Sequence, residues 1–261
     1  MLKLSRPAAE VFIPDGASWE AASVRVTHLV VAAHADDVEI MAWHAVLHAE
    51  GLAAVIVTGG EDGDRRRLEQ KRAASRGNYA AVIWLDHASA DVKQAACPAL
   101  ASDLGAVLSA IRPRLVYTHN PADRHDTHVA VALHTVHALR ENATPVERVF
   151  GCEVWRALDW LQADDKVVLD VSAAEDRLMP LIGEFDSQLA GGKRYDLAAA
   201  GRKRANATFL DSHAVDRASA VEYAMDLTPL VKDSTLDVMR WTLALVERFA
   251  RDVEARLAPW K

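Results

Sequence analysis

The sequence predicts an α/β fold: a Rossmann-like three-layer sandwich around a mostly parallel sheet, with a helical addition at the C-terminal end. Two observations predict it. Short apolar runs rich in β-branched residues, which suit strands buried on both faces, alternate with longer segments of helical periodicity. The spacing of this alternation is that of right-handed βαβ units, which build parallel sheets covered by helices on both faces.

The apolar runs and the helical segments follow each other in a regular order. Strands are expected over residues 27–33, 53–58, 81–85, 114–118, 146–155 and 167–171. Helices are expected over residues 36–50, 65–78, 98–111 and 128–140. Gly51 is the stop signal for the first of these helices. Residues 1–26 contain Pro7, Pro14 and Gly16 without a clear period, so we expect an irregular arm there.

We interpret the chain as one domain over residues 1–261, with a core at 27–190 and a mostly helical part at 191–261. Apolar side chains recur at roughly the helical period between residues 230 and 257: Leu236, Met239, Leu243, Val246 and Phe249. Such a helix can pack on its own domain or form the contact of a homo-oligomer. The sequence leaves both open.

Composition excludes several classes of protein. With 51% hydrophobic and 26% charged residues among 261, the chain is not of the disordered type. Two cysteines make no disulfide framework, no apolar run is long enough to span a membrane, and the first nine residues lack a signal-peptide core. A net charge of −7 argues against a nucleic-acid partner. We expect a cytoplasmic enzyme with no membrane or nucleic-acid partner.

Two clusters of His and Asp residues directly follow expected strands. Residues 34–39 (HADDVE) follow the first strand, and residues 119–128 (HNPADRHDTH) follow the fourth. Ligand sites of open α/β sheets lie beyond the carboxyl ends of the strands, so the clusters are expected to meet in one crevice. Imidazole and carboxylate suit zinc or a similar divalent ion. A catalytic zinc takes three protein ligands and one water, and a remaining Asp can act as the base.

Each residue also has a simpler interpretation when it is considered alone. Asp36 and Asp37 suit the N-cap and first turn of a helix, where acidic side chains are favoured. His125 and His128 suit a loop or a cap. Their joint placement at strand ends of one parallel sheet favours the metal site.

The two clusters resemble motifs of a known family. Residues 34–39 resemble the His-Pro-Asp-Asp-x-Glu signature of the PIG-L/LmbE-like zinc-dependent N-acetylglucosaminyl deacetylase family, and residues 125–128 are similar to its His-Pro-Asp-His motif. Further similarities lie at residues 58–61, 66–69, 151–155 and 187–188. The resemblance covers roughly residues 29–188 and continues more weakly to about 225.

The resemblance implies a zinc-dependent hydrolase that removes an N-acetyl group from an N-acetylglucosamine-type sugar or small-molecule glycoconjugate. Matched residue by residue, it makes His34, Asp37 and His128 the ligands of Zn²⁺ or another divalent metal. Asp36 falls on the general base that activates the zinc-held water, and His125 on the histidine that stabilises the oxyanion.

Two further positions match the family's substrate-binding residues. Arg66 falls on an arginine that contacts substrate, and Asp86 falls on a sugar-binding carboxylate. The resemblance therefore implies a small-molecule glycoside as the binding partner.

The sequence departs from the family pattern at two positions. Ala35 replaces the usual proline, which loosens the turn but leaves the ligands in place. Thr127 replaces the aspartate expected to orient the catalytic histidine. Asp123 and Asp126 are nearby carboxylates that could take over this role, or His125 could work with a lower pKa.

Two other functions stay open at this point. The same site could hydrolyse another small-molecule amide, such as a thiol conjugate. The domain could also be a non-catalytic metal- or nucleotide-binding α/β module. Asp36 argues against a pure binding site, because such a site needs no additional base, and the glycine-rich residues 59–63 lack a nucleotide-binding motif.

Overall fold

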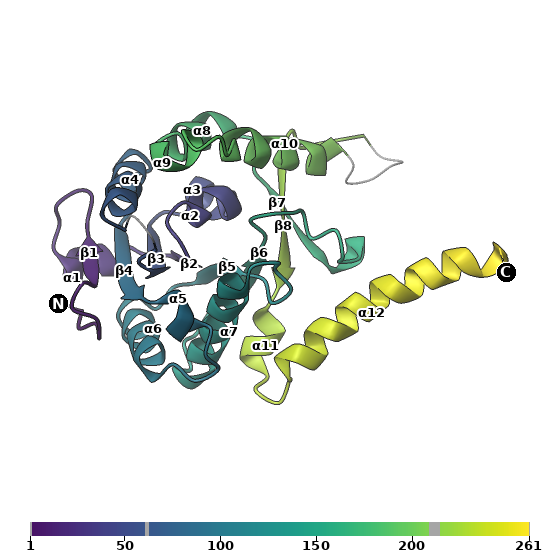
Figure 1. Cartoon of the computed structure of the whole chain (residues 1–261), viewed down its shortest axis with the longest axis horizontal. Helices are drawn as coiled ribbons and strands as arrows, with labels where there is room; N and C mark the ends of the chain where they lie inside the picture. The colour runs from purple at the N-terminus through teal and green to yellow at the C-terminus, as the bar shows by residue number, and fades with distance from the viewer. Residues whose placement is uncertain (1, 61–62, 209–214, 261) are drawn as a thin grey trace.

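An eight-stranded sheet forms the middle layer of the described part of the molecule (Figure 1). The computed structural model describes residues 2–60, 63–208 and 215–260. The strands are β1 (Glu10–Phe12), β2 (His28–Ala32), β3 (Leu52–Thr58), β4 (Ala81–His87), β5 (Leu115–His119), β6 (Arg148–Cys152), β7 (Lys166–Asp170) and β8 (Val221–Asp226). Their order across the sheet is β1-β4-β3-β2-β5-β6-β8-β7.

The centre of the sheet is parallel and its two edges are antiparallel. Strands β4, β3, β2, β5 and β6 pair in parallel, whereas β1 pairs antiparallel with β4, and β8 antiparallel with β6 and β7. Every residue of β2 and β3 is buried, which explains why both read as continuous apolar runs. The strand order reverses between β2 and β5, so this fold places its ligand crevice at the carboxyl ends of these two strands.

Helices cover both faces of the sheet. They are α1 (Trp19–Ser23), α2 (Asp37–Met41), α3 (Trp43–His48), α4 (Gly63–Arg76), α5 (Ser89–Val92), α6 (Pro98–Ile111), α7 (Asp126–Glu141), α8 (Glu175–Ile182), α9 (Asp186–Leu189), α10 (Tyr195–Thr208), α11 (Thr228–Lys232) and α12 (Val238–Leu257). One apolar core joins the sheet to α2, α3, α4, α8 and α10. A second core joins its other face to α5, α6, α7 and α11. Figure 1 shows these two groups of helices on opposite sides of the sheet. The predicted three-layer α/β fold is confirmed.

The structure differs from the sequence-based expectations in three elements. The arm of residues 1–26 contributes the short edge strand β1, and the part after residue 190 contributes β8, so the sheet extends past the expected core. The helix expected over residues 36–50 is divided into α2 and α3 at Ala42, whose backbone leaves the helical region at φ −122° and ψ 46°. The domain limits remain a prediction.

Helix α12 leaves the body of the molecule (Figure 1). Its first turns pack on the second core through Val238, Trp241 and Leu245. The helix then continues to Leu257 with its side chains largely exposed. No helix among the described residues is long and apolar enough to cross a membrane.

Candidate metal and catalytic site

The turn after β2 carries the first cluster. The Thr58 backbone N–H and hydroxyl both donate to the carbonyl of Ala33, at 3.0 and 2.8 Å, and fix the end of the strand. Asp36 then adopts φ 85°, in the left-handed region that non-glycine residues rarely occupy. This turn lets the Asp37 carboxylate accept a hydrogen bond of 2.8 Å from the His34 N–H. The Asp36 side chain caps nothing, so its carboxylate is free to face the site.

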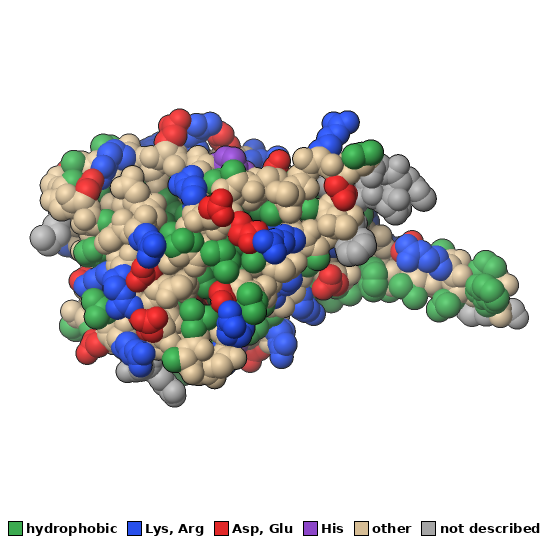
Figure 2. All heavy atoms as spheres, turned by 90° about the horizontal axis from the view of Figure 1, so that it is seen from above, with side chains coloured by type: hydrophobic (Ala, Val, Ile, Leu, Met, Phe, Trp, Pro, Cys, Tyr) green, Lys and Arg blue, Asp and Glu red, His purple; other side chains and the backbone are tan. Residues whose placement is uncertain are grey.

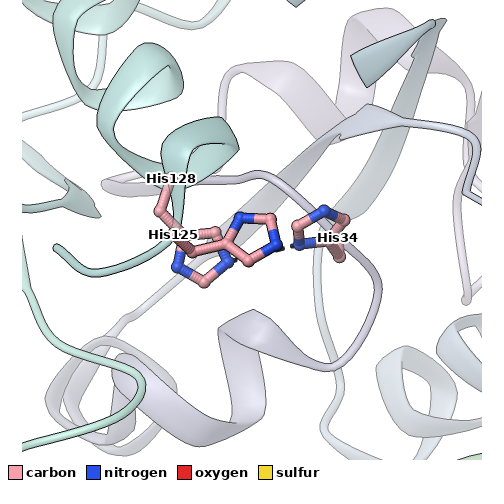
Figure 3. Close-up of side chains that lie close together, drawn as sticks. All are labelled: His34, His125 and His128. Atoms are coloured by element: carbon pink, nitrogen blue, oxygen red, sulfur yellow. Dashed lines mark hydrogen bonds between the residues drawn. The ribbon is translucent and has the colours of Figure 1, made fainter. Parts of the chain in front are cut away.

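The loop between β5 and α7 carries the second cluster. Asn120 donates to the carbonyl of Cys152 at 3.0 Å, and Asp123 accepts a hydrogen bond of 2.9 Å from the His125 N–H. Helix α7 begins directly after His125, which places His128 in its first turn. Figure 3 shows His125 and His128 meeting His34 from the other segment.

The three predicted ligands lie close enough to hold one ion. His34 Nδ1 is 3.3 Å from Asp37 Oδ2 and 3.3 Å from His128 Nε2, and the latter two atoms are 3.5 Å apart. A tetrahedral zinc with bonds of about 2.0–2.1 Å separates its ligand atoms by about 3.4 Å. The donor set therefore fits a divalent ion in size and in chemistry.

Opposite electrostatic environments surround the two adjacent carboxyl groups. Burial and the charge of Asp37 raise the pKa of Asp36 well above its usual value, although the Arg66 guanidinium, 2.9 Å from Asp36 Oδ2, opposes this shift. Burial also acts to raise the pKa of Asp37, but the histidines around it hold that pKa well below the usual range. Neighbouring groups with divergent pKa values are typical of acid–base sites.

The sequence analysis missed His119, the last residue of β5. This buried histidine accepts a hydrogen bond of 2.9 Å from the Ala33 N–H through Nε2, and its ring stacks on His128 with centroids 3.9 Å apart. Burial lowers the pKa of His119 to about 4, so the ring is neutral. Nε2 also lies 3.4 Å from Asp37 Oδ2, so His119 lies directly beside the predicted ligands Asp37 and His128, while its Nε2 lone pair is occupied by the Ala33 N–H. Its position at the strand end, as the first residue of the second cluster, was the available signal.

A cavity of about 180 Å³ opens over these residues. His34, Asp36, Asp37, Arg66, His125 and His128 line it, so the structure brings six of the seven predicted site residues together. The rest of the lining comes from Ile40, Val154, Trp155, Gln188, Lys193 and Tyr195. Asp86 is not part of this lining, since its carboxylate pairs with Arg67. Its role in substrate binding remains a prediction.

His125 is held by its backbone and not by a carboxylate. Its Nδ1 is buried and has no hydrogen-bond partner among the described residues. Asp123 Oδ2 lies 3.3 Å from Nδ1 of His128, whereas Asp126 is exposed at the start of α7. Burial, with the nearby His128 and His34, lowers the pKa of His125. The buried carboxylate of this loop, Asp123, therefore contacts the ring of His128 and not that of His125.

Fold and site together define a class of protein: an α/β enzyme with a compact His/Asp cluster at the carboxyl ends of its parallel strands. Residues 29–139 match the family model described as PIG-L: GlcNAc-PI de-N-acetylase. Over these residues the match confirms the resemblance stated from the motifs. It also confirms the predicted class of enzyme, an N-deacetylase that acts on non-peptide amide bonds.

Solved structures share the fold. The conserved protein TT1542 from Thermus thermophilus has a TM-score of 0.62 and 23% identity, over 77% of this chain and 94% of that chain. GalB, the 4-carboxy-2-hydroxymuconate hydratase from Pseudomonas putida KT2440, has a TM-score of 0.60 and 20% identity, over 77% and 96%. N,N'-diacetylchitobiose deacetylase from Pyrococcus horikoshii has a TM-score of 0.54 and 12% identity, over 75% and 82%. No curated protein matches the sequence significantly.

Proposed function

We propose that the protein is a metal-dependent deacetylase that removes the N-acetyl group of an N-acetylglucosamine-type sugar or small-molecule glycoconjugate. The observation that carries the proposal is the set of three donor atoms, 3.3–3.5 Å apart, beside a buried carboxyl of raised pKa. Its partners in this proposal are a small-molecule glycoside and, through the C-terminal helix, a second copy of the chain.

The residues divide the chemistry among themselves. His34, Asp37 and His128 would hold Zn²⁺ or another divalent ion, which when bound supplies Lewis acidity to the amide carbonyl and makes water more acidic. Asp36 accepts the proton of the attacking water and delivers it to the leaving amine, a role that suits a carboxyl of raised pKa. His125 lines the same cavity and donates a hydrogen bond to the oxyanion.

Arg66 holds the proposed base in position. Its guanidinium pairs with Asp36 Oδ2 at 2.9 Å and also donates to the carbonyl of Ala35. The arginine therefore links α4 to the turn that carries the base, and it limits the rise in the pKa of Asp36.

The sugar part of the substrate is supported by the family description and by the cavity mouth. The matched family is named for a GlcNAc-linked amide, and one similar structure is a deacetylase of N,N'-diacetylchitobiose. Trp155 and Tyr195 line the cavity, and their rings lie 6.5 Å apart at a nearly right-angled orientation. Aromatic faces of this kind suit the apolar face of a pyranose ring.

A second candidate reaction comes from the hydratase among the similar structures. A hydratase adds water to a double bond, whereas a deacetylase adds it to an amide. Hydrolysis of another small-molecule amide, such as a thiol conjugate, is the third option for this site.

Acetate release and metal content test the proposal together. The wild type is expected to hold about one divalent ion per chain and to release acetate from N-acetylglucosamine conjugates. His34→Ala and His128→Ala should lose metal and activity. Asp36→Asn should keep the metal and lose about 10²–10⁴-fold in rate. The exposed Asp126→Asn is the matched control, with both properties retained.

Each failure has a distinct meaning. Full metal occupancy in both histidine variants would refute the ligand set. Wild-type turnover in Asp36→Asn would place the base elsewhere. A metal-loaded protein that releases no acetate from any such conjugate would refute the proposed reaction and turn attention to hydration or to other amides.

A further inference from the structure

Helix α12 exposes an apolar stripe that its own chain does not cover. Eleven large apolar side chains are exposed in the described residues, and six of them lie in the last part of the chain: Met239, Leu243, Phe249, Val253, Leu257 and Trp260. Figure 1 shows this helix projecting from the body, and Figure 2 shows green side chains along it. Contiguous exposed apolar surface of this kind marks an interaction site.

The spacing of the stripe is that of a helix pair. Four of the exposed residues, together with the half-buried Val246 and the exposed Ala250, follow one another at intervals of four, three, four, three and four. They are Met239, Leu243, Val246, Ala250, Val253 and Leu257. Alternating intervals of four and three give the 3.5-residue period that two paired helices need to keep one face in contact. This sequence of intervals reads the same from either end. The helix is therefore complementary to an inverted copy of itself.

The inverted copy brings apolar residues into matched layers. With the centre at Arg248, Met239 lies opposite Leu257 of the second copy, and Leu243 lies opposite its Val253. Near the centre, Val246 lies opposite Ala250, which is small enough to let the helices approach. Both copies contribute the same patch, as in a closed two-fold interface.

Charges along one edge of the stripe favour the inverted arrangement. Arg240, Glu247 and Glu254 are seven residues apart, so they share this edge, with a base near the body and acids towards the tip. Within the described residues, Arg240 and Glu254 take part in no ion pair, whereas Glu247 pairs with Arg251 at 3.7 Å. Inversion places Arg240 of each copy near Glu254 of the other. It also brings the two Glu247 side chains near each other, each of them paired with Arg251 of its own chain. The antiparallel alignment also opposes the two helix dipoles favourably.

We infer that two copies of this chain associate through α12, with the two helices antiparallel and centred near Arg248. This inference rests on the association with a second copy that is part of the proposed function. The experiments that test the helix pairing do not depend on catalytic activity. The two bodies then lie at opposite ends of a helix pair about 30 Å long.

The mass of the full chain in solution gives the first test. By light scattering, the wild type is expected to have twice the 28.5 kDa mass of one chain. The double variant Leu243→Glu/Val253→Glu is expected to have the mass of one chain. Val24→Glu, at an exposed apolar residue in the N-terminal part, is the matched control and should stay dimeric. A monomeric wild type, a larger closed assembly, or a dimer that survives both substitutions would overturn the inference.

Disulfide trapping tests the direction of the helices. In a Cys97→Ser background, which removes the native cysteine that is not buried, Leu243→Cys and Val253→Cys are prepared separately. An antiparallel pair predicts that the mixed variants cross-link far more than either alone, because residues 243 and 253 meet only between unlike chains. Cross-linking of each variant with itself, without a gain on mixing, would show a parallel pair. Retained acetate release in the monomeric variant would separate this result from the catalytic proposal.

Discussion

Asp123 is the carboxylate that lies behind His128 in this site. Thr127 stands where the family pattern has a carboxylate, and it is buried in the first turn of α7. Asp123, five residues before His128, faces Nδ1 of that histidine at 3.3 Å and accepts a hydrogen bond from the His125 N–H. Carboxylates behind metal-binding histidines fix the ring and raise its basicity.

Asp123→Asn is expected to weaken metal binding. Removing the carboxylate behind a histidine ligand typically costs about 10–100-fold in metal affinity. Competition with a coloured chelator measures this loss, and the exposed Asp126→Asn serves as the matched control. Equal affinity in Asp123→Asn and the wild type would show that the carboxylate does not support His128.

The site residues differ in how far the sequence could identify them. His34, Asp36, Asp37 and His128 follow strand ends in a recognisable motif, so their proximity could be predicted from parallel pairing. The position of His119 at a strand end could be predicted, but its contacts could not, because they depend on the register that places Ala33 beside the end of β5. A one-residue change of register would turn the His119 ring to the other face of the sheet.

Two features of the secondary structure were also not predictable from the sequence: strand β8 and the division between α2 and α3. Strand β8 lies far along the chain, and it is a strand because it fits between β6 and β7, not because of its own periodicity. The division between α2 and α3 at Ala42 follows from packing on the first core, where Met41, Ala42 and Trp43 are all fully buried. The long buried runs of β2 and β3 were predictable, since both faces are covered.

Two glycines in different elements are expected to respond in opposite directions to alanine. At Gly51, before β3, a Cβ atom would lie 2.1 Å from the carbonyl oxygen of Arg25, so Gly51→Ala should destabilise the fold by about 1–3 kcal/mol. At Gly201, inside α10, a Cβ atom meets nothing within 4 Å. Gly201→Ala should stabilise the fold by about 0.5–1 kcal/mol, because alanine favours helix.

Urea unfolding of both variants measures these changes. A Gly51→Ala protein as stable as the wild type would mean that the loop before β3 can move away from Arg25. A destabilised Gly201→Ala protein would mean that α10 is not helical at this position.

The buried His28 at the start of β2 makes stability depend on pH. Burial and the nearby Arg114 lower the pKa of His28 from 6.5 to about 4 in the folded protein. Below pH 6.5 the unfolded chain therefore takes up a proton that the folded chain refuses until about pH 4. The contribution of neutral His28 to the free energy of unfolding is therefore fully present above pH 6.5. It is lost as the pH falls from 6.5 to about 4, at up to about 1.4 kcal/mol per pH unit.

His28→Gln is expected to reduce this loss. Urea unfolding of metal-free protein at about pH 7.5 and about pH 5 should show a smaller decrease for His28→Gln than for the wild type. His137→Gln, at an exposed position of α7, should lose as much as the wild type. An equal decrease in all three proteins would mean that His28 takes up its proton in the folded state.

At the scale of the whole molecule, the proposed ion joins two halves of the sheet. Its ligands come from the turn after β2 and from α7, on either side of the point where strand order reverses. At a metal concentration of about 1,000 times Kd, binding stabilises the folded state by about 4 kcal/mol. For a chain of this size that is about 8–16 °C in Tm.

Chelation is therefore expected to lower the Tm of the wild type by this amount, as measured by calorimetry. His34→Ala should melt near the temperature of the chelated wild type and should not respond to the chelator. A Tm unchanged by chelation, with the metal shown to be removed, would contradict a role of the ion in joining the two halves.

The backbone conformation of Asp36 means that selection for thermal stability and selection for catalytic activity favour different residues at this position. An aspartate at φ 85° stores about 1–3 kcal/mol that a glycine at the same place would release. Asp36→Gly also removes a buried carboxyl of raised pKa. A library screened for survival at high temperature alone should accumulate Asp36→Gly, and the survivors should no longer release acetate. Their absence from such a screen would show that the turn is held in place without strain.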